Sequence, residues 1–147
     1  MWSLNSENRL QSWKRFRKSI STMPLEEAIT ATGKLWASAP WTPYYLDADN
    51  PSDWPDPWTL LDENYYCDLA KALGIVYTLA LSEHNNISAE VRVYKDPNKH
   101  YFYNLAWIDD GKYILNMQDG EIVNKEQFDK TLQLQFKYST KELKLEI

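Results

Sequence analysis

The stretch "NYYCDLAKALGIVYTLAL" (residues 64–81) decides the fold. Tyr66, Leu69 and Leu73 recur at helical spacing and form one apolar stripe, and Cys67 and Ala70 begin a second. A helix that is apolar around so much of its circumference is buried in the middle of a domain. Its apolar run is far shorter than the roughly 20 residues that span a bilayer. The sequence therefore predicts a buried central helix within residues 62–84 and no membrane segment.

Two more helices are predicted before it. Leu10, Trp13 and Phe16 recur every three or four residues, with basic residues between them, which is typical of an amphipathic helix with a basic outer face. Pro24 separates this helix from the next, because proline disfavours helix in the preceding residue and suits a first helical turn. We therefore expect a helical pair in residues 1–38.

The part of the chain that follows the central helix predicts strands. Apolar and polar residues alternate there with the period of two that marks a half-buried strand, and "DDGK" supplies a hairpin turn. The alternating segments are residues 88–94, 100–108, 112–117, 132–138 and 141–147. The fold class is therefore α+β, with N-terminal helices and a buried central helix packed on a C-terminal antiparallel β-meander (87–147). At 147 residues the chain suits a single domain, 1–147.

Residues 39–61, which we call the strap, are rich in tryptophan, proline and acids. Five prolines predict an extended backbone. Its aromatic side chains either cover the start of the Cys67 helix, with Trp54 and Trp58 packed there, or project toward a partner as interface anchors. From 35 to 70 the chain has seven acids and no lysine or arginine, which suits a protein partner with a basic surface. The predicted partner-binding residues are three anchors and four charges: Trp41, Trp54, Trp58, Asp47, Asp49, Asp53 and Asp56.

Composition excludes several classes of function. A net charge of −5 and a pI near 5.0 argue against nucleic-acid binding. Four glycines leave no phosphate-binding loop, so we expect no cofactor. The aspartates of the strap fail the template of a calcium loop at Ser52 and Trp58, and one cysteine with two histidines does not build a zinc site, so no metal is expected. No signal peptide is recognisable at the N-terminus, and a lone cysteine forms no internal disulfide, which favours the cytoplasm.

Cys67 is the candidate nucleophile, because a thiol at the start of a helix is favoured as the thiolate by the helix dipole. The competing interpretation is a buried, unreactive cysteine among aromatic neighbours. His84 lies near the far end of the same predicted helix, roughly 25 Å away. His100 begins one predicted strand and Asn116 ends the next, so both can face the start of the helix. The candidate triad is therefore Cys67, His100 and Asn116.

Residues 67–116 resemble a reduced transglutaminase-like or papain-like core. The resemblance covers about a third of the chain and consists of a cysteine at a helix start, a strand "AEVRVY", a strand that opens with histidine in "HYFYNLAWIDDGKY", and a strand that closes on "ILN". It implies a cysteine acyltransferase or hydrolase. The sequence departs from the family at Tyr65 and Tyr66, where Gly or Trp precedes the cysteine, at Phe102, where the family has Trp, and at Asn116, where it has Asp.

The strap together with "YYCDLAKALG" also resembles small uncharacterised proteins of tailed bacteriophages. On this basis the leading hypothesis is a non-enzymatic protein–protein interaction or virion assembly module, located in the host cytoplasm or in the virion. One alternative is the transglutaminase-like enzyme with the Cys67, His100 and Asn116 triad. Another is an acidic inhibitor of a basic host protein.

Overall fold

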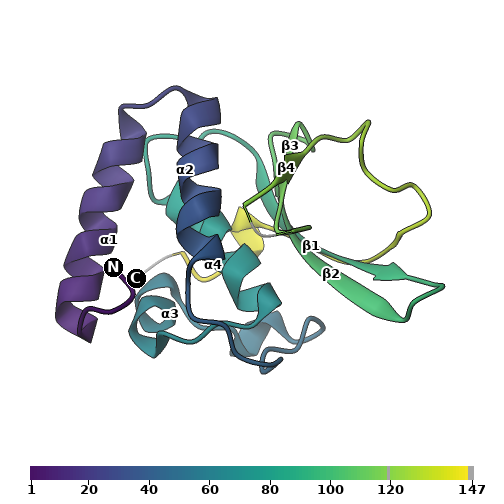
Figure 1. Ribbon diagram of the computed structural model, residues 1–147, viewed down its shortest axis with the longest axis horizontal. Coiled ribbons are helices and arrows are strands. Elements are labelled where there is room, and N and C mark those ends of the chain that lie inside the picture. The colour runs from purple at the N-terminus through teal and green to yellow at the C-terminus, as the bar shows by residue number, and fades with distance from the viewer. Residues whose placement is uncertain (119, 146–147) are drawn as a thin grey trace.

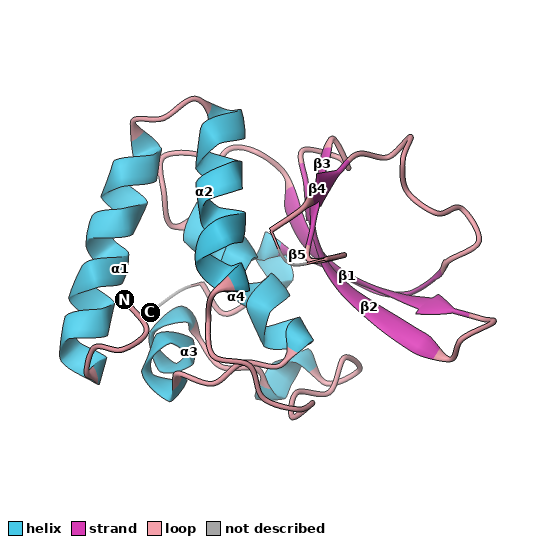
Figure 2. Cartoon of the chain, in the orientation of Figure 1, coloured by secondary structure: helices cyan, strands magenta, loops and turns pink. Residues whose placement is uncertain are grey.

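The structure is a computed structural model that describes residues 1–118 and 120–145. The helices are α1 (Ser6–Ser21), α2 (Leu25–Ala37), α3 (Pro57–Glu63) and α4 (Asp68–Ala80), with short 3-10 turns η1 (Pro51–Asp53) and η2 (Thr140–Glu142). The strands are β1 (Ala89–Asp96), β2 (Tyr101–Ile108), β3 (Tyr113–Leu115), β4 (Ile122–Val123) and β5 (Gln133–Ser139). The predicted α+β class is confirmed, with the helices grouped on one side and the strands on the other (Figure 2).

Helix α4 occupies the centre of the molecule, between the other helices and the sheet (Figure 1). Eleven of its thirteen residues are buried, as an almost wholly apolar helix requires. Two buried indoles meet it on one side: the Nε1 atoms of Trp13 and Trp36 both donate to Thr78 Oγ1, at 3.1 and 2.9 Å. Gly74 lets Trp36 lie directly against the helix, because a Cβ at that position would be 2.5 Å from the indole ring.

The five strands form one antiparallel sheet in the order β4-β3-β2-β1-β5. The predicted meander holds for β1 to β4, and "DDGK" makes the turn between β2 and β3. Strand β5 differs, since it returns across the sheet to pair with β1 instead of continuing beyond β4. The last predicted strand, 141–147, is not formed over residues 141–145, where η2 and a coil stand in its place; Ile147 lies outside the described residues.

The sheet is covered on both faces. Ala106, Ile108 and Leu115 face α4 and belong to the main core. The opposite face carries a second apolar cluster, closed by the long connection between β4 and β5 that loops out beside the sheet in Figure 1. That cluster consists of Tyr94, Leu105, Trp107, Ile114, Phe128 and Leu132.

The boundaries around the strap differ from the predicted ones. The strap was expected to be extended, yet its end folds as α3, which begins after Asp56, whose side chain accepts the amide of Thr59 at 2.8 Å, and has Pro57 in its first turn. Helix α3 ends at Asn64 in the left-handed conformation, with φ of 57°. Of the predicted central helix 62–84, residues 62–63 are therefore the end of α3, and the buried helix α4 covers only 68–80.

Candidate active site

Cys67 is the N-cap residue of α4, with extended backbone angles. The residue before it is held by the strap: Tyr66 forms a parallel bridge with Trp41, its amide donates to Pro40 O at 2.8 Å, and its carbonyl accepts the amide of Thr42 at 3.1 Å. The thiol itself is only 2% exposed. The cysteine was expected within the first turn of the central helix; it lies directly before that turn, with the strap beside it.

Asn116 lies close to the start of α4. It follows β3 directly with φ of 77°, and its Nδ2 donates to Asp68 O at 2.9 Å and to Asn104 O at 2.8 Å. Both amide protons of the side chain are therefore used. The contact joins the end of β3, the middle of β2 and the residue after Cys67, so two members of the predicted triad lie in one region.

His100 is not brought to this region. It is the exposed last residue of the turn between β1 and β2, with φ of 52°, and its backbone amide donates to Asp96 O. That turn is at the end of the hairpin that projects away from the helices in Figure 1. Asn104 marks where β2 passes the start of α4, and four residues of strand separate it from His100, roughly 13 Å at the rise of a strand.

Tyrosines surround the thiol on the side of the strap. The Tyr45 hydroxyl donates to Glu63 Oε1 at 3.1 Å and to Tyr65 O at 3.2 Å. Burial, reinforced by the negative charge of Glu63, raises the pKa of Tyr45, and burial raises the pKa of Glu63. The Tyr44 hydroxyl donates to the Asp47 carboxylate, and this bond is the main cause that raises the pKa of Tyr44 to about 12.

Sequence reasoning did not single out Tyr44, Tyr45 or Glu63. Their only signal in the sequence is the density of tyrosines and acids in the strap. That density does not tell which rings turn toward Cys67.

Of the three predicted anchors, Trp54 is packed inside the molecule and Trp58 is half-buried. Trp54 is 1% exposed, and its Nε1 donates to Asp47 O at 2.8 Å. Trp58 packs edge-on against Trp13 at 5.5 Å between ring centroids, with the Arg17 guanidinium over it. Trp54 cannot serve as an exposed anchor, because its ring supplies core packing. Trp41 is 62% exposed and is the most exposed of the three predicted anchors.

The predicted charges of the strap are exposed or half-buried. Asp47, Asp49 and Asp53 are exposed, and Asp53 accepts Asn50 Nδ2 at 2.7 Å. Asp56 is half-buried and caps α3. Among residues 1–118 and 120–145, the ion pairs are Arg92 with Glu90 and Lys125 with Asp110, so none of the strap's acids is neutralised in this way.

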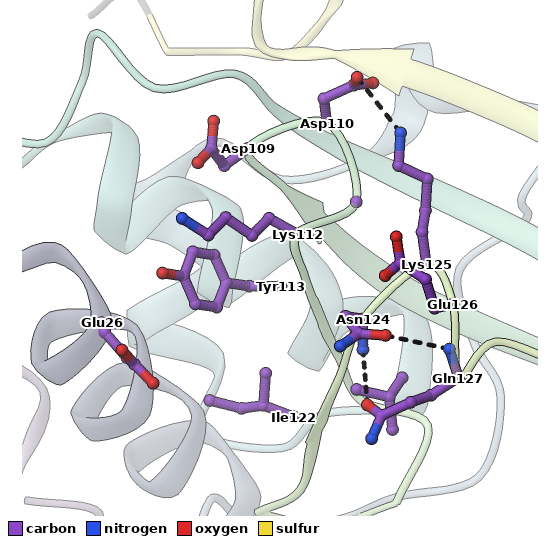
Figure 3. A pocket seen from close by; sticks show the side chains of 12 residues that line it. Glu26, Asp109, Asp110, Lys112, Tyr113, Ile122, Asn124, Lys125, Glu126 and Gln127 are labelled. Atoms are coloured by element: carbon purple, nitrogen blue, oxygen red, sulfur yellow. Dashed lines mark hydrogen bonds and ion pairs between the residues drawn. The ribbon is translucent and has the colours of Figure 1, made fainter.

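A separate open pocket of about 710 Å³ lies between the β2–β3 turn and residues 122–127 (Figure 3). Its lining is polar and is held by Lys125, whose Nζ lies 3.3 Å from Asp110 Oδ2 and whose amide donates to Gly111 O. Glu26 of α2 borders it. No cysteine or histidine lines this pocket, so it contains no member of the predicted triad.

Within residues 1–118 and 120–145, no helix is long and apolar enough to cross a membrane. No group of three or more His, Cys, Asp or Glu side chains there is placed to hold a metal ion.

In fold, the chain is similar to solved structures that have the transglutaminase-like fold. Two solved structures of LapG from Legionella pneumophila share it. The calcium-bound form matches with a TM-score of 0.71 at 10% identity, covering 93% of this chain and 77% of LapG. A second LapG structure matches with a TM-score of 0.67 at 10% identity, covering 93% and 81%. At this identity the likeness shows the fold alone. No family model and no curated protein matches the sequence.

These comparisons correct the leading hypothesis. The prediction of a non-enzymatic assembly module of bacteriophage origin is wrong, because the structural neighbours have the transglutaminase-like fold on which the alternative enzyme hypothesis depended. The resemblance to bacteriophage proteins has no support among them.

Proposed function

We propose that this protein is a transglutaminase-like cysteine enzyme that transfers or hydrolyses an acyl group through Cys67. The observation that carries the proposal is the place of the thiol: Cys67 caps the central helix of a transglutaminase-like fold, and Asn116 is bonded to the next residue of that helix. Three separate parts of the sequence meet there: the start of α4, the residue Asn116 after β3, and Asn104 in β2.

The chemistry follows from the helix start. The Cys67 thiolate attacks the carbonyl carbon of the substrate, which forms a tetrahedral oxyanion, and the oxyanion collapses to a thioester as the protonated leaving group departs. Amides of the first turn of a helix have no acceptor within the helix. The amides of residues 68–70 therefore suit stabilisation of the oxyanion. Water, or an amine in a transfer reaction, then releases the acyl group from the sulfur.

His100 is proposed as the base with Asn116 beside the site. Asn116 uses both protons of its amide on carbonyl groups, so its Oδ1 atom is the part that can accept an imidazole proton. Proton transfer by His100 requires the β1–β2 turn to fold toward the start of α4. Without that movement, the helix terminus alone activates the thiol. Activation by His100 and activation by the helix terminus alone give different pH profiles of Cys67 alkylation.

The test is alkylation of the native protein with iodoacetamide, followed by mass spectrometry from acid to alkaline pH. The proposal expects Cys67 to be labelled near neutral pH, at a rate well above the rate of global unfolding measured in the same buffer. His100→Gln keeps the polarity and size of the side chain and removes the imidazole, so a slower alkylation with a pH dependence that differs from that of the wild type identifies His100 as the base.

Asn116→Ala is the second variant, and we expect a slower alkylation with the fold retained. His84→Gln is the matched control, because His84 lies at the other end of α4, where its Nε2 contacts Ile20 O at 2.9 Å. A thiol that is labelled only as fast as the protein unfolds would remove the proposed function, whatever the behaviour of the histidine variants.

A further inference from the structure

Large aromatic side chains are exposed beside the candidate active site. Trp41, Tyr44 and Tyr65 are 62%, 68% and 48% exposed, although rings of this size are usually packed. We call these three side chains the aromatic rim. They are three of the seven large apolar side chains that are exposed among the described residues. A concentration of this kind marks a binding surface more often than a packing defect.

The rim residues lie on two segments of the chain that a β-bridge holds side by side. Trp41 forms that bridge with Tyr66, the residue after Tyr65. The Tyr65 ring lies 5.4 Å from that of Tyr45, centroid to centroid, and Tyr44 is the neighbour of Tyr45 in the chain. Cys67 follows two residues after Tyr65. The rim therefore borders the start of α4.

Negative charge surrounds the rim. Asp47 accepts the Tyr44 hydroxyl, Glu63 accepts that of Tyr45, and exposed Asp49 lies in the same segment of the strap. The two lysines that reach this part of the molecule are already engaged with carbonyl groups. Lys71 is 4% exposed and donates to Ala37 O, and Lys144 donates to Ser52 O and Trp54 O. No ion pair offsets these acids within residues 1–118 and 120–145.

We infer that the aromatic rim, with Asp47, Asp49 and Glu63, binds an extended polypeptide segment that carries arginine or lysine side chains. The inference deepens the proposed function. It rests on that function in one respect, because the bound segment is taken as the substrate that the Cys67 thiolate attacks. Exposed rings attract cations through their faces, and uncompensated carboxylates beside them add attraction over a longer range. A segment that runs along the strap would pass the helix start where the thiol lies.

The negative charge of the strap favours a cationic segment over other occupants. A nucleic acid or an acidic peptide would meet seven acids without a basic residue in 35–70. A purely apolar partner would pack favourably against the rings, but it would bury the carboxylates of Asp47, Asp49 and Glu63 without a partner for their charge. A cationic segment satisfies both components of the surface.

The experiment measures binding in the Cys67→Ala variant, so that it does not depend on catalysis. Two short peptides are labelled with tetramethylrhodamine, one of alternating arginine and glycine and one of alternating glutamate and glycine, and fluorescence anisotropy is recorded. The inference expects the arginine peptide alone to bind. Each of Trp41→Ala, Tyr44→Ala and Tyr65→Ala should weaken its binding about two- to five-fold, the range for an exposed cation–π contact.

Two controls separate the surface from general stickiness. Leu134→Ala removes a 46% exposed apolar side chain from β5 and should leave binding unchanged. Asp49→Asn should weaken binding at low salt, with a smaller effect as the salt rises from about 0.05 to about 0.5 M.

Equal binding of the two peptides would overturn the inference. So would an arginine peptide that fails to bind the parent, or that binds a variant with Trp41→Ala, Tyr44→Ala and Tyr65→Ala combined as well as it binds the parent. None of these results bears on the alkylation of Cys67 in the wild-type protein, so failure of the inference and failure of the proposed function are distinguishable.

Discussion

Thr78→Val tests the packing that holds α4 in place. The Thr78 hydroxyl accepts both buried indole N–H groups, from Trp13 at 3.1 Å and Trp36 at 2.9 Å, and donates to Gly74 O at 2.7 Å. Valine has nearly the same shape, so the change removes the acceptor without opening a cavity. A buried donor left without an acceptor costs about 1–3 kcal/mol, so two of them cost about 2–6 kcal/mol of the free energy of unfolding.

The assay is urea unfolding followed by tryptophan fluorescence, which reports directly on the indoles that lose their acceptor. A loss of this size is a large part of the roughly 5–15 kcal/mol that stabilises a typical domain. Thr78→Ser is the matched control: it keeps the hydroxyl and removes one methyl group, so we expect a loss of only about 1 kcal/mol. The reasoning is refuted if Thr78→Val unfolds within about 0.5 kcal/mol of wild type, or if Thr78→Ser is equally destabilised.

Three further predictions concern stability. Gly74→Ala should destabilise by more than about 2 kcal/mol despite the better helix propensity of alanine, because its Cβ would lie 2.5 Å from the Trp36 ring; a neutral or stabilising effect in urea unfolding would contradict the close approach. Arg9→Met should cost roughly 3 kcal/mol, since the guanidinium donates to the carbonyl oxygens of Leu61 and Asp62 in α3 and of Leu4 before α1; an unchanged unfolding midpoint would exclude that role. Burial raises the pKa of Tyr66 and of Tyr77, so the folded state keeps protons that the unfolded state releases above about pH 10. The stability that these tyrosines contribute is present below that pH and is lost as the pH rises toward their folded values; titration at alkaline pH by absorbance and melting temperature should show a late, cooperative tyrosine ionisation, and early ionisation of all tyrosines in the folded protein would contradict it.

Local patterns in the sequence predicted the elements that depend on local physics. The apolar residues around the whole circumference of α4 predicted that this helix is buried. The alternation in 88–94 and 100–108 predicted β1 and β2. Each of these patterns reflects the residue period of a single helix or strand. Long-range pairing was not accessible in the same way. Strand β5 pairs with β1 across an intervening loop, and its alternation is equally compatible with a place beyond β4.

The strap shows the same limit at the level of the site. Composition identified its stiffness and its charge, but Trp41 and Trp54 carry the same side chain in the same kind of context. Trp41 is exposed, whereas Trp54 is buried against Tyr138. The ring centroids of Trp54 and Tyr138 are 5.0 Å apart, a contact that depends on the position of β5. The position of Cys67 at a helix start followed from the pattern around it, whereas the place of His100 depended on how far the β1–β2 hairpin extends.

The most direct test of the account is acylation of Cys67 by an activated ester. The native protein is mixed with p-nitrophenyl acetate at neutral pH, quenched at short times and digested for mass spectrometry. The account predicts a burst of p-nitrophenol matched by one acetyl group on Cys67, absent in Cys67→Ala and lost with time as the thioester turns over. Acetylation that spares Cys67 in the folded protein, with release of p-nitrophenol no faster than in the Cys67→Ala variant, would contradict it.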